Sequence, residues 1–153
     1  RKPNRENVQR RGSTMSGEQQ MEIQGKTGTG APTQRARVLV VDDEPTILEL
    51  IEVLLEDLYD VTCVNGGFAA IETLESDPAF DSILCDMTMP EVDGVALHRF
   101  LMENLPDLAG KLRFLSGGVH GDRAEQHLRD HPTPIVTKPF TTEALDAAVR
   151  SAL

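Results

Sequence analysis

Five short apolar runs alternate with helical patterns along this chain, and that alternation constrains the fold more than any other feature. The apolar runs predict strands at residues 37–42, 59–64, 82–86, 112–116 and 135–138. Helical spacing or helix-starting residues follow each run, and they predict helices near 45–58, 68–76, 95–104 and 122–129 and from residue 142 onwards. Strands and helices that alternate in this way form parallel sheets with right-handed crossovers and helices on both faces. We therefore predict an α/β fold with a five-stranded parallel sheet.

Two of the predicted helices have an identifiable apolar face. In the last helix that face is formed by Leu145, Ala148 and Val149, and Thr142 is predicted to begin and cap the helix. In the first helix, which follows Pro45, the apolar residues at helical spacing are Ile47, Leu50, Ile51, Leu54 and Leu58.

The first 34 residues differ from the rest in composition. They are rich in Gln, Gly, Ser, Thr and Arg and contain few large apolar residues. No strand or helix period persists in them, which is typical of a disordered segment. We expect residues 1–34 to be a disordered linker, an expression remnant or the tail of an upstream domain. The folded domain is predicted to cover residues 35–153.

The charge is also unevenly distributed. Residues 1–34 carry six Lys or Arg and three Glu, so residues 35–153 have a net charge of -13 in a chain of net charge -10. We expect no binding to nucleic acid or insertion into a membrane, because an acidic domain is repelled by anionic surfaces and no apolar run is long enough to span a bilayer. Cys63 and Cys85 lie in apolar runs rather than in a disulfide framework, which favours a reducing cytoplasm.

Acidic residues stand where two of the predicted strands end. Asp42 and Asp43 follow the first strand, and Asp86 ends the third. In a flavodoxin-like sheet, with strand order 2-1-3-4-5, these strands are neighbours, and ligands bind at the carboxyl ends of the strands. Carboxylates that converge raise one another's pKa or bind a cation, and oxygen ligands favour Mg²⁺ or a similar hard ion. The alternative is that these acids only stabilise the start of the following helix through its dipole.

A hydroxyl and an amine end the fourth and fifth strands. Ser116 precedes two glycines, and its hydroxyl has two possible partners: a phosphoryl oxygen, or its own loop backbone in an ST-turn. Lys138 ends an apolar run, where burial is costly unless the amine pairs with a carboxylate. The alternative is a surface lysine that buries only its stem. The bond between Lys138 and Pro139 is a candidate cis peptide, since X–Pro bonds permit it.

Taken together, these motifs resemble the receiver domain of the two-component response-regulator family. The resemblance covers about residues 35–153, with the motifs in the family's order and spacing. The matching segments are Val38-Leu39-Val40-Val41-Asp42-Asp43-Glu44-Pro45, Asp86-Met87-Thr88-Met89-Pro90 with Asp93-Gly94, Leu115-Ser116-Gly117 and Val136-Thr137-Lys138-Pro139-Phe140.

The resemblance implies a role for each of these side chains. Asp86 would accept a phosphoryl group from a histidine kinase or a histidine phosphotransfer protein, and Ser116 and Lys138 would bind the phosphoryl oxygens. Such a domain is a phosphoacceptor that slowly dephosphorylates itself rather than an enzyme of many turnovers. The ligands implied for Mg²⁺ (or Mn²⁺) are Asp42, Asp43, Asp86 and the main-chain carbonyl of Thr88.

One departure from the family pattern leaves the signalling output open. The family usually has an aromatic residue three positions before the lysine, where this chain has Ile135. A phosphorylation-independent interaction module is therefore the main alternative function. The Asp-Met-Thr-Met-Pro form and the Gly117-Gly118 pair resemble receivers attached to hybrid sensor kinases, so we expect a C-terminal piece of a larger kinase. A metal-dependent phosphatase is disfavoured, because residues 35–153 leave no room for a cap over a substrate.

Overall fold

The computed structural model describes residues 34–153, so the disorder predicted before Gln34 lies outside the described residues. The described part of the chain alternates strands and helices as the sequence predicts. Its elements are β1 (Arg37–Asp42), α1 (Pro45–Leu55), β2 (Asp60–Asn65), α2 (Gly67–Ser76), β3 (Ser82–Asp86), α3 (Gly94–Asn104), α4 (Pro106–Ala109), β4 (Leu112–Ser116), α5 (Asp122–Asp130), β5 (Ile135–Thr137) and α6 (Thr142–Arg150).

The five strands form one parallel sheet in the order β2-β1-β3-β4-β5, which confirms the predicted flavodoxin-like topology. β1 pairs on both sides, so that Val40 lies opposite Cys63 of β2 and Leu84 of β3. β4 continues the sheet beside β3, with Leu115 opposite Asp86. Because β1 and β3 are direct neighbours, the acidic residues at their carboxyl ends meet at one edge of the sheet.

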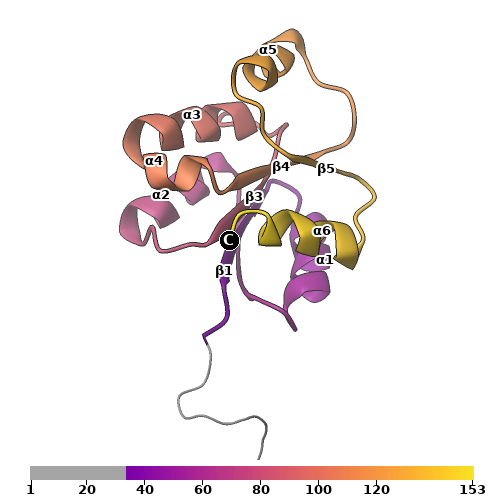
Figure 1. The fold of residues 1–153 in the computed structure, drawn as a ribbon. Helices are drawn as coiled ribbons and strands as arrows, with labels where there is room; N and C mark the ends of the chain where they lie inside the picture. Colours follow the sequence, from indigo (N-terminus) through magenta and orange to yellow (C-terminus); the bar gives the residue numbers. More distant parts are fainter. Residues whose placement is uncertain (1–33) are drawn as a thin grey trace, which may run out of the picture. The chain divides into compact units, whose positions relative to one another are not determined.

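Helices cover both faces of this sheet. In Figure 1, α1 and α6 lie on one face, and α2, α3 and α4 lie on the other. Val38 and Val40 of β1 pack toward α1 and α6, whereas Leu39 and Val41 pack toward α2 and α3. All four side chains are fully buried, as expected for a central strand of a parallel sheet. Their continuous apolar run therefore fills two separate halves of the core.

The core-facing side of α1 differs in part from the sequence prediction. Leu48, Ile51 and Leu55 are the residues that the helix buries. Leu50, which was assigned to the apolar face, is 43% exposed, and Leu58 is 46% exposed beyond the end of the helix. This helix carries apolar residues on more than one side, so periodicity alone does not select the side that contacts the sheet.

Two further local predictions require correction. The cap of α6 is Thr141 rather than Thr142, and its hydroxyl accepts a hydrogen bond of 3.0 Å from the N–H of Ala144. Thr142 begins the helix, as predicted, but the cap is the residue before it, because Thr141 still has extended backbone. The short helix α4 was not predicted, since its four residues are too few to show a period. The inner face of α6 is formed by Leu145, Ala148 and Val149, as predicted.

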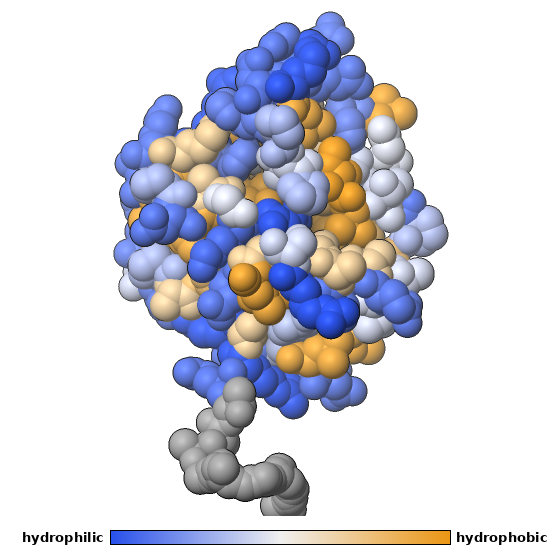
Figure 2. All heavy atoms as spheres, in the orientation of Figure 1, coloured by the Kyte–Doolittle hydropathy of each residue, from blue (hydrophilic) through white to orange (hydrophobic). Residues whose placement is uncertain are grey.

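The helix predicted near residues 122–129 is present as α5 and is largely hydrophilic. The space-filling view shows hydrophilic residues over α5 and a group of hydrophobic residues below it, over β4 and β5 (Figure 2). The residue that α5 buries is His127, whose Nε2 lies 2.8 Å from Nδ1 of His98 on α3. His127, together with the partly buried Ala124 and Leu128, thus attaches α5 to the domain.

Both cysteines are free thiols, Cys63 on β2 and Cys85 buried on β3. Within residues 34–153, none of the helices has the length and apolar character that crossing a membrane requires.

Candidate functional site

Three carboxylates converge at the carboxyl edge of the sheet. Asp42 and Asp86 are the last residues of β1 and β3, and Asp43 follows Asp42 directly. One carboxylate oxygen from each of the three lies within 4.8 Å of the other two. Asp42 also supports the start of α1, because its Oδ1 accepts a hydrogen bond of 2.9 Å from the N–H of Glu44. The two interpretations of these acids are therefore compatible, because Asp42 both stabilises the start of α1 and belongs to the acid cluster.

Burial makes the negative charge of this cluster costly. Asp42 is fully buried, and its Oδ2 has no hydrogen-bond partner within the part of the chain that the structure describes. Burial raises the pKa of Asp42, against the lowering effect of the Glu44 N–H. Burial, and next the charge of Asp42, raise the pKa of Asp86 to about 6, although Lys138 and the N–H of Thr88 oppose the rise. Carboxylates held in this way gain stability from a bound cation.

Lys138 brings a positive charge to the same edge. Its Nζ lies 3.9 Å from Oδ1 of Asp86, and its side chain is 29% exposed. Lys138 directly follows the end of β5, and its backbone is held against β4, because its N–H donates a hydrogen bond of 2.8 Å to the carbonyl of Ser116. The peptide bond between Lys138 and Pro139 is cis. The amine therefore reaches the acids while one side remains open to solvent.

Ser116 ends β4 one residue beyond Leu115, the neighbour of Asp86 in the sheet. Its side chain is buried, and its Oγ accepts a hydrogen bond of 2.9 Å from the N–H of Gly118. This is the ST-turn that the sequence left as an alternative. Gly118 has φ +118°, which turns the loop back over the serine. Nε2 of His120 also lies 3.3 Å from the same Oγ, a contact that no sequence pattern predicts.

The residues after Asp86 hold the strand end in place. The N–H of Gly94 donates a hydrogen bond of 3.1 Å to the carbonyl of Met87. A Cβ at position 94 would lie 2.6 Å from the carbonyl oxygen of Asp86, so the start of α3 can approach the site only with glycine there. Asp93 caps α3 through the N–H of Ala96 and also forms an ion pair of 2.7 Å with Arg123 of α5. The sequence marked Asp93 and Gly94 only as part of a motif, and the structure gives each a physical role.

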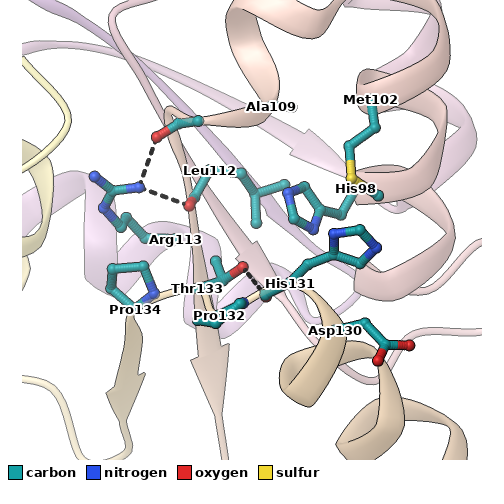
Figure 3. A pocket seen from close by; sticks show the side chains of 11 residues that line it. His98, Met102, Ala109, Leu112, Arg113, Asp130, His131, Pro132, Thr133 and Pro134 are labelled. Carbon is teal, nitrogen blue, oxygen red and sulfur yellow. Dashed lines mark hydrogen bonds between the residues drawn. The ribbon is translucent and has the colours of Figure 1, made fainter.

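One hollow in the surface adjoins the acids, and another lies away from them. A small one of about 120 Å³ adjoins the acids and is lined by Asp43, Asn65, Gly66, Gly67, Phe68, Pro90 and Glu91. A larger one of about 490 Å³ lies by Leu112, at the opposite end of β4. Figure 3 shows the rings of His98 and His131 beside it, and its lining contains none of the predicted site residues. The predicted site residues therefore lie at the acidic edge of the sheet and not around the larger hollow.

Comparison with known proteins agrees with this fold. Residues 38–150 match the family model of the response regulator receiver domain. The chain is 37% identical over 105 residues to the response regulator receiver protein CpdR of Brucella abortus, a match that covers 68% of this chain and 85% of CpdR. A response regulator receiver domain from Clostridium thermocellum superposes with a TM-score of 0.68 at 28% identity, covering 76% of this chain and 93% of that structure.

The family match and the fold are those of a signalling domain that accepts a phosphoryl group. The chain belongs to the response regulator receiver domain family, and its function is that of a phosphoacceptor in two-component signal transduction.

Sensor kinases also contain segments similar to this chain. It is 40% identical over 73 residues to the sensor protein GacS of Pseudomonas syringae, a match that covers 47% of this chain and 8% of GacS. A solved receiver domain of a signal transduction histidine kinase from Syntrophus aciditrophicus has 30% identity and a TM-score of 0.66, covering 77% of this chain and 89% of that structure. The chain thus spans less than a tenth of the length of the GacS protein that it matches.

Proposed function

We propose that Asp86 is the residue that accepts the phosphoryl group. The observation that carries the proposal is that its carboxylate lies within 4.8 Å of the oxygens of Asp42 and Asp43 and 3.9 Å from Nζ of Lys138. A carboxylate is a competent nucleophile toward phosphorus when the accumulating charge is neutralised. In the transfer, an oxygen of Asp86 forms a bond to phosphorus while the bond from phosphorus to the donor's histidine nitrogen breaks. Lys138 and the hydroxyl of Ser116 bind the phosphoryl oxygens.

The acid cluster fits a hard divalent cation. The donors are oxygens, Oδ2 of Asp42 lacks a hydrogen-bond partner within residues 34–153, and the pKa of both Asp42 and Asp86 is raised. Mg²⁺ prefers oxygen ligands, and Mn²⁺ accepts the same set. When bound, the ion offsets the repulsion between an anionic donor and an anionic acceptor. The proposed ligands are Asp42, Asp43, Asp86 and the main-chain carbonyl of Thr88.

The phosphoryl donor is proposed to be a histidine kinase or a histidine phosphotransfer protein in the cytoplasm. The resemblance to GacS and to the sensor protein TorS of Escherichia coli supports a hybrid kinase as the parent protein. Under this proposal the domain either relays the phosphoryl group or changes a contact within the same kinase.

Incubation with Mg²⁺ and acetyl phosphate tests the proposed acceptor. We expect intact-mass measurement to show one added phosphoryl group on the wild type and none on Asp86→Asn. Asp107→Asn is the matched control, since Asp107 is an exposed acid on α4 at the other end of the sheet. Equal modification of wild type and Asp86→Asn would exclude Asp86 as the acceptor.

One observation favours a second candidate function, an interaction module that does not depend on phosphorylation. Ile135, on β5, stands where the family usually has an aromatic residue, and it is 38% exposed. Backbone NMR spectra separate the two functions. For a phosphorylation-dependent switch, modification moves amide signals of β5 and α5, far from Asp86 in the sequence. Changes confined to the residues around Asp86 would favour the second candidate.

A further inference from the structure

The hydroxyl of Ser116 has one proton to donate and several possible hydrogen-bond partners. A serine hydroxyl donates one hydrogen bond and accepts up to two. One of its lone pairs is already used by the N–H of Gly118, at 2.9 Å. Nε2 of His120 lies 3.3 Å from the same oxygen. The direction of the single hydroxyl proton therefore depends on whether Nε2 of His120 carries a proton of its own.

The two protonation patterns of His120 have opposite consequences. When Nε2 carries no proton, it accepts a hydrogen bond from the hydroxyl of Ser116. The hydroxyl then points to His120 and cannot donate to another acceptor. When Nε2 carries a proton, it donates to the second lone pair of Ser116, and the hydroxyl proton is free for a third partner. In that second pattern every bonding position of Ser116 is satisfied once an oxygen anion arrives beside it.

We propose that His120 is a positioning residue for the phosphoryl group: by donating from Nε2 to Ser116, it directs the serine hydroxyl onto a phosphoryl oxygen at Asp86. This inference rests on the proposed function, because it takes Asp86 as the acceptor. By linkage, a phosphoryl group that prefers the donating form also increases the fraction of His120 that carries a proton on Nε2.

The loop between β4 and α5 is built to allow this contact. Gly118 has a positive φ, which brings both its own N–H and the ring of His120 back to Ser116. A Cβ at Gly117, Gly118 or Gly121 would meet nothing within 4 Å, so no other segment packs against the loop at these glycines. His120 is partly exposed, whereas Ser116 is only 3% exposed. The imidazole therefore connects solvent to a buried hydroxyl.

The test uses beryllofluoride with Mg²⁺ as a stable stand-in for the phosphoryl group, on the full chain. Nitrogen NMR of the four histidine rings is recorded before and after addition. We expect Nε2 of His120 to move to the protonated range in the complex, while His131, which borders the cavity by Leu112 at the opposite end of β4, does not change. An Nε2 of His120 that stays bare in the complex would overturn the proposal.

Substitutions supply the second measurement, the affinity for beryllofluoride. His120→Leu removes the donor and should weaken binding by about fivefold, the value of one ordinary hydrogen bond. His120→Gln restores an N–H donor and should bind within about twofold of the wild type, as should the control His131→Gln. Equal affinity of His120→Leu and wild type would refute the proposed role of His120 and would leave the proposed acceptor unaffected. Equal binding by Asp86→Asn would instead refute the proposed acceptor.

Discussion

Asp86 is expected to destabilise the fold that contains it when no cation is bound. Its pKa is raised from 3.8 to about 6, first by burial and second by the charge of Asp42. A carboxyl group whose pKa is higher in the folded state than in the unfolded state lowers the free energy of unfolding when the pH is above the folded pKa. This lost free energy is regained as the pH falls from the folded pKa to the unfolded pKa. A difference of about two pKa units, at about 1.4 kcal/mol each, corresponds to about 3 kcal/mol. This value already includes the favourable effect of Lys138.

Asp86→Asn keeps the shape of the side chain and removes its charge. Without divalent ions and at about pH 7.5, the variant should be more stable than the wild type by about 3 kcal/mol. The difference should shrink as the pH falls below about 6 and disappear only below the unfolded pKa of 3.8, where Asp86 is protonated in both states. Urea unfolding followed by circular dichroism measures both values. Mg²⁺ should stabilise the wild type more than the variant, because the proposed site for the ion is the acid cluster of the folded state.

The control for this experiment is Asp107→Asn, which removes an exposed charge and should change the unfolding free energy by no more than about 0.5 kcal/mol. An Asp86→Asn variant that is equally or less stable than the wild type at neutral pH, without divalent ions, would refute the reasoning. It would mean that the pairing with Lys138 outweighs burial and the repulsion from Asp42.

Three further predictions concern the framework of the site. Burial lowers the pKa of His127 to about 4, so the unfolded state takes up a proton first as the pH falls. Between about pH 7.5 and pH 5 the wild type should lose about 2 kcal/mol more unfolding free energy than His127→Gln, a comparison in which the effect of Asp86 cancels. Gly94→Ala places a Cβ 2.6 Å from the carbonyl oxygen of Asp86 and should lower the urea midpoint by an amount equivalent to about 1–3 kcal/mol; an unchanged midpoint would mean that α3 shifts freely. Asp93→Ala removes the cap of α3 and the ion pair with Arg123 and should cost about 1–2 kcal/mol, whereas Asp93→Asn, which keeps a capping oxygen, should retain most of that stability.

Much of the fold and of the acidic edge could be predicted from the sequence. The strand and helix alternation predicts a parallel sheet, and the flavodoxin-like strand order places the ends of β1 and β3 side by side. Asp42, Asp43 and Asp86 therefore had to meet, because the backbone hydrogen bonds of neighbouring strands fix their register. Lys138 could be placed at the same edge for the same reason. Local sequence and strand pairing were sufficient, and no side-chain packing had to be known.

What only the tertiary structure decided depends on packing between distant segments. Leu50 and Ile51 are equally apolar, yet Ile51 is buried and Leu50 is exposed, because the position of α1 against the sheet is set by the partners it meets there. The contact of His120 with Ser116 depends on the turn at Gly118, and His127 is buried because His98 lies across from it on α3. Such contacts join residues that no short-range pattern relates. The sequence by itself therefore determined where the acids and the lysine are, whereas the folded structure decided which neighbours orient them.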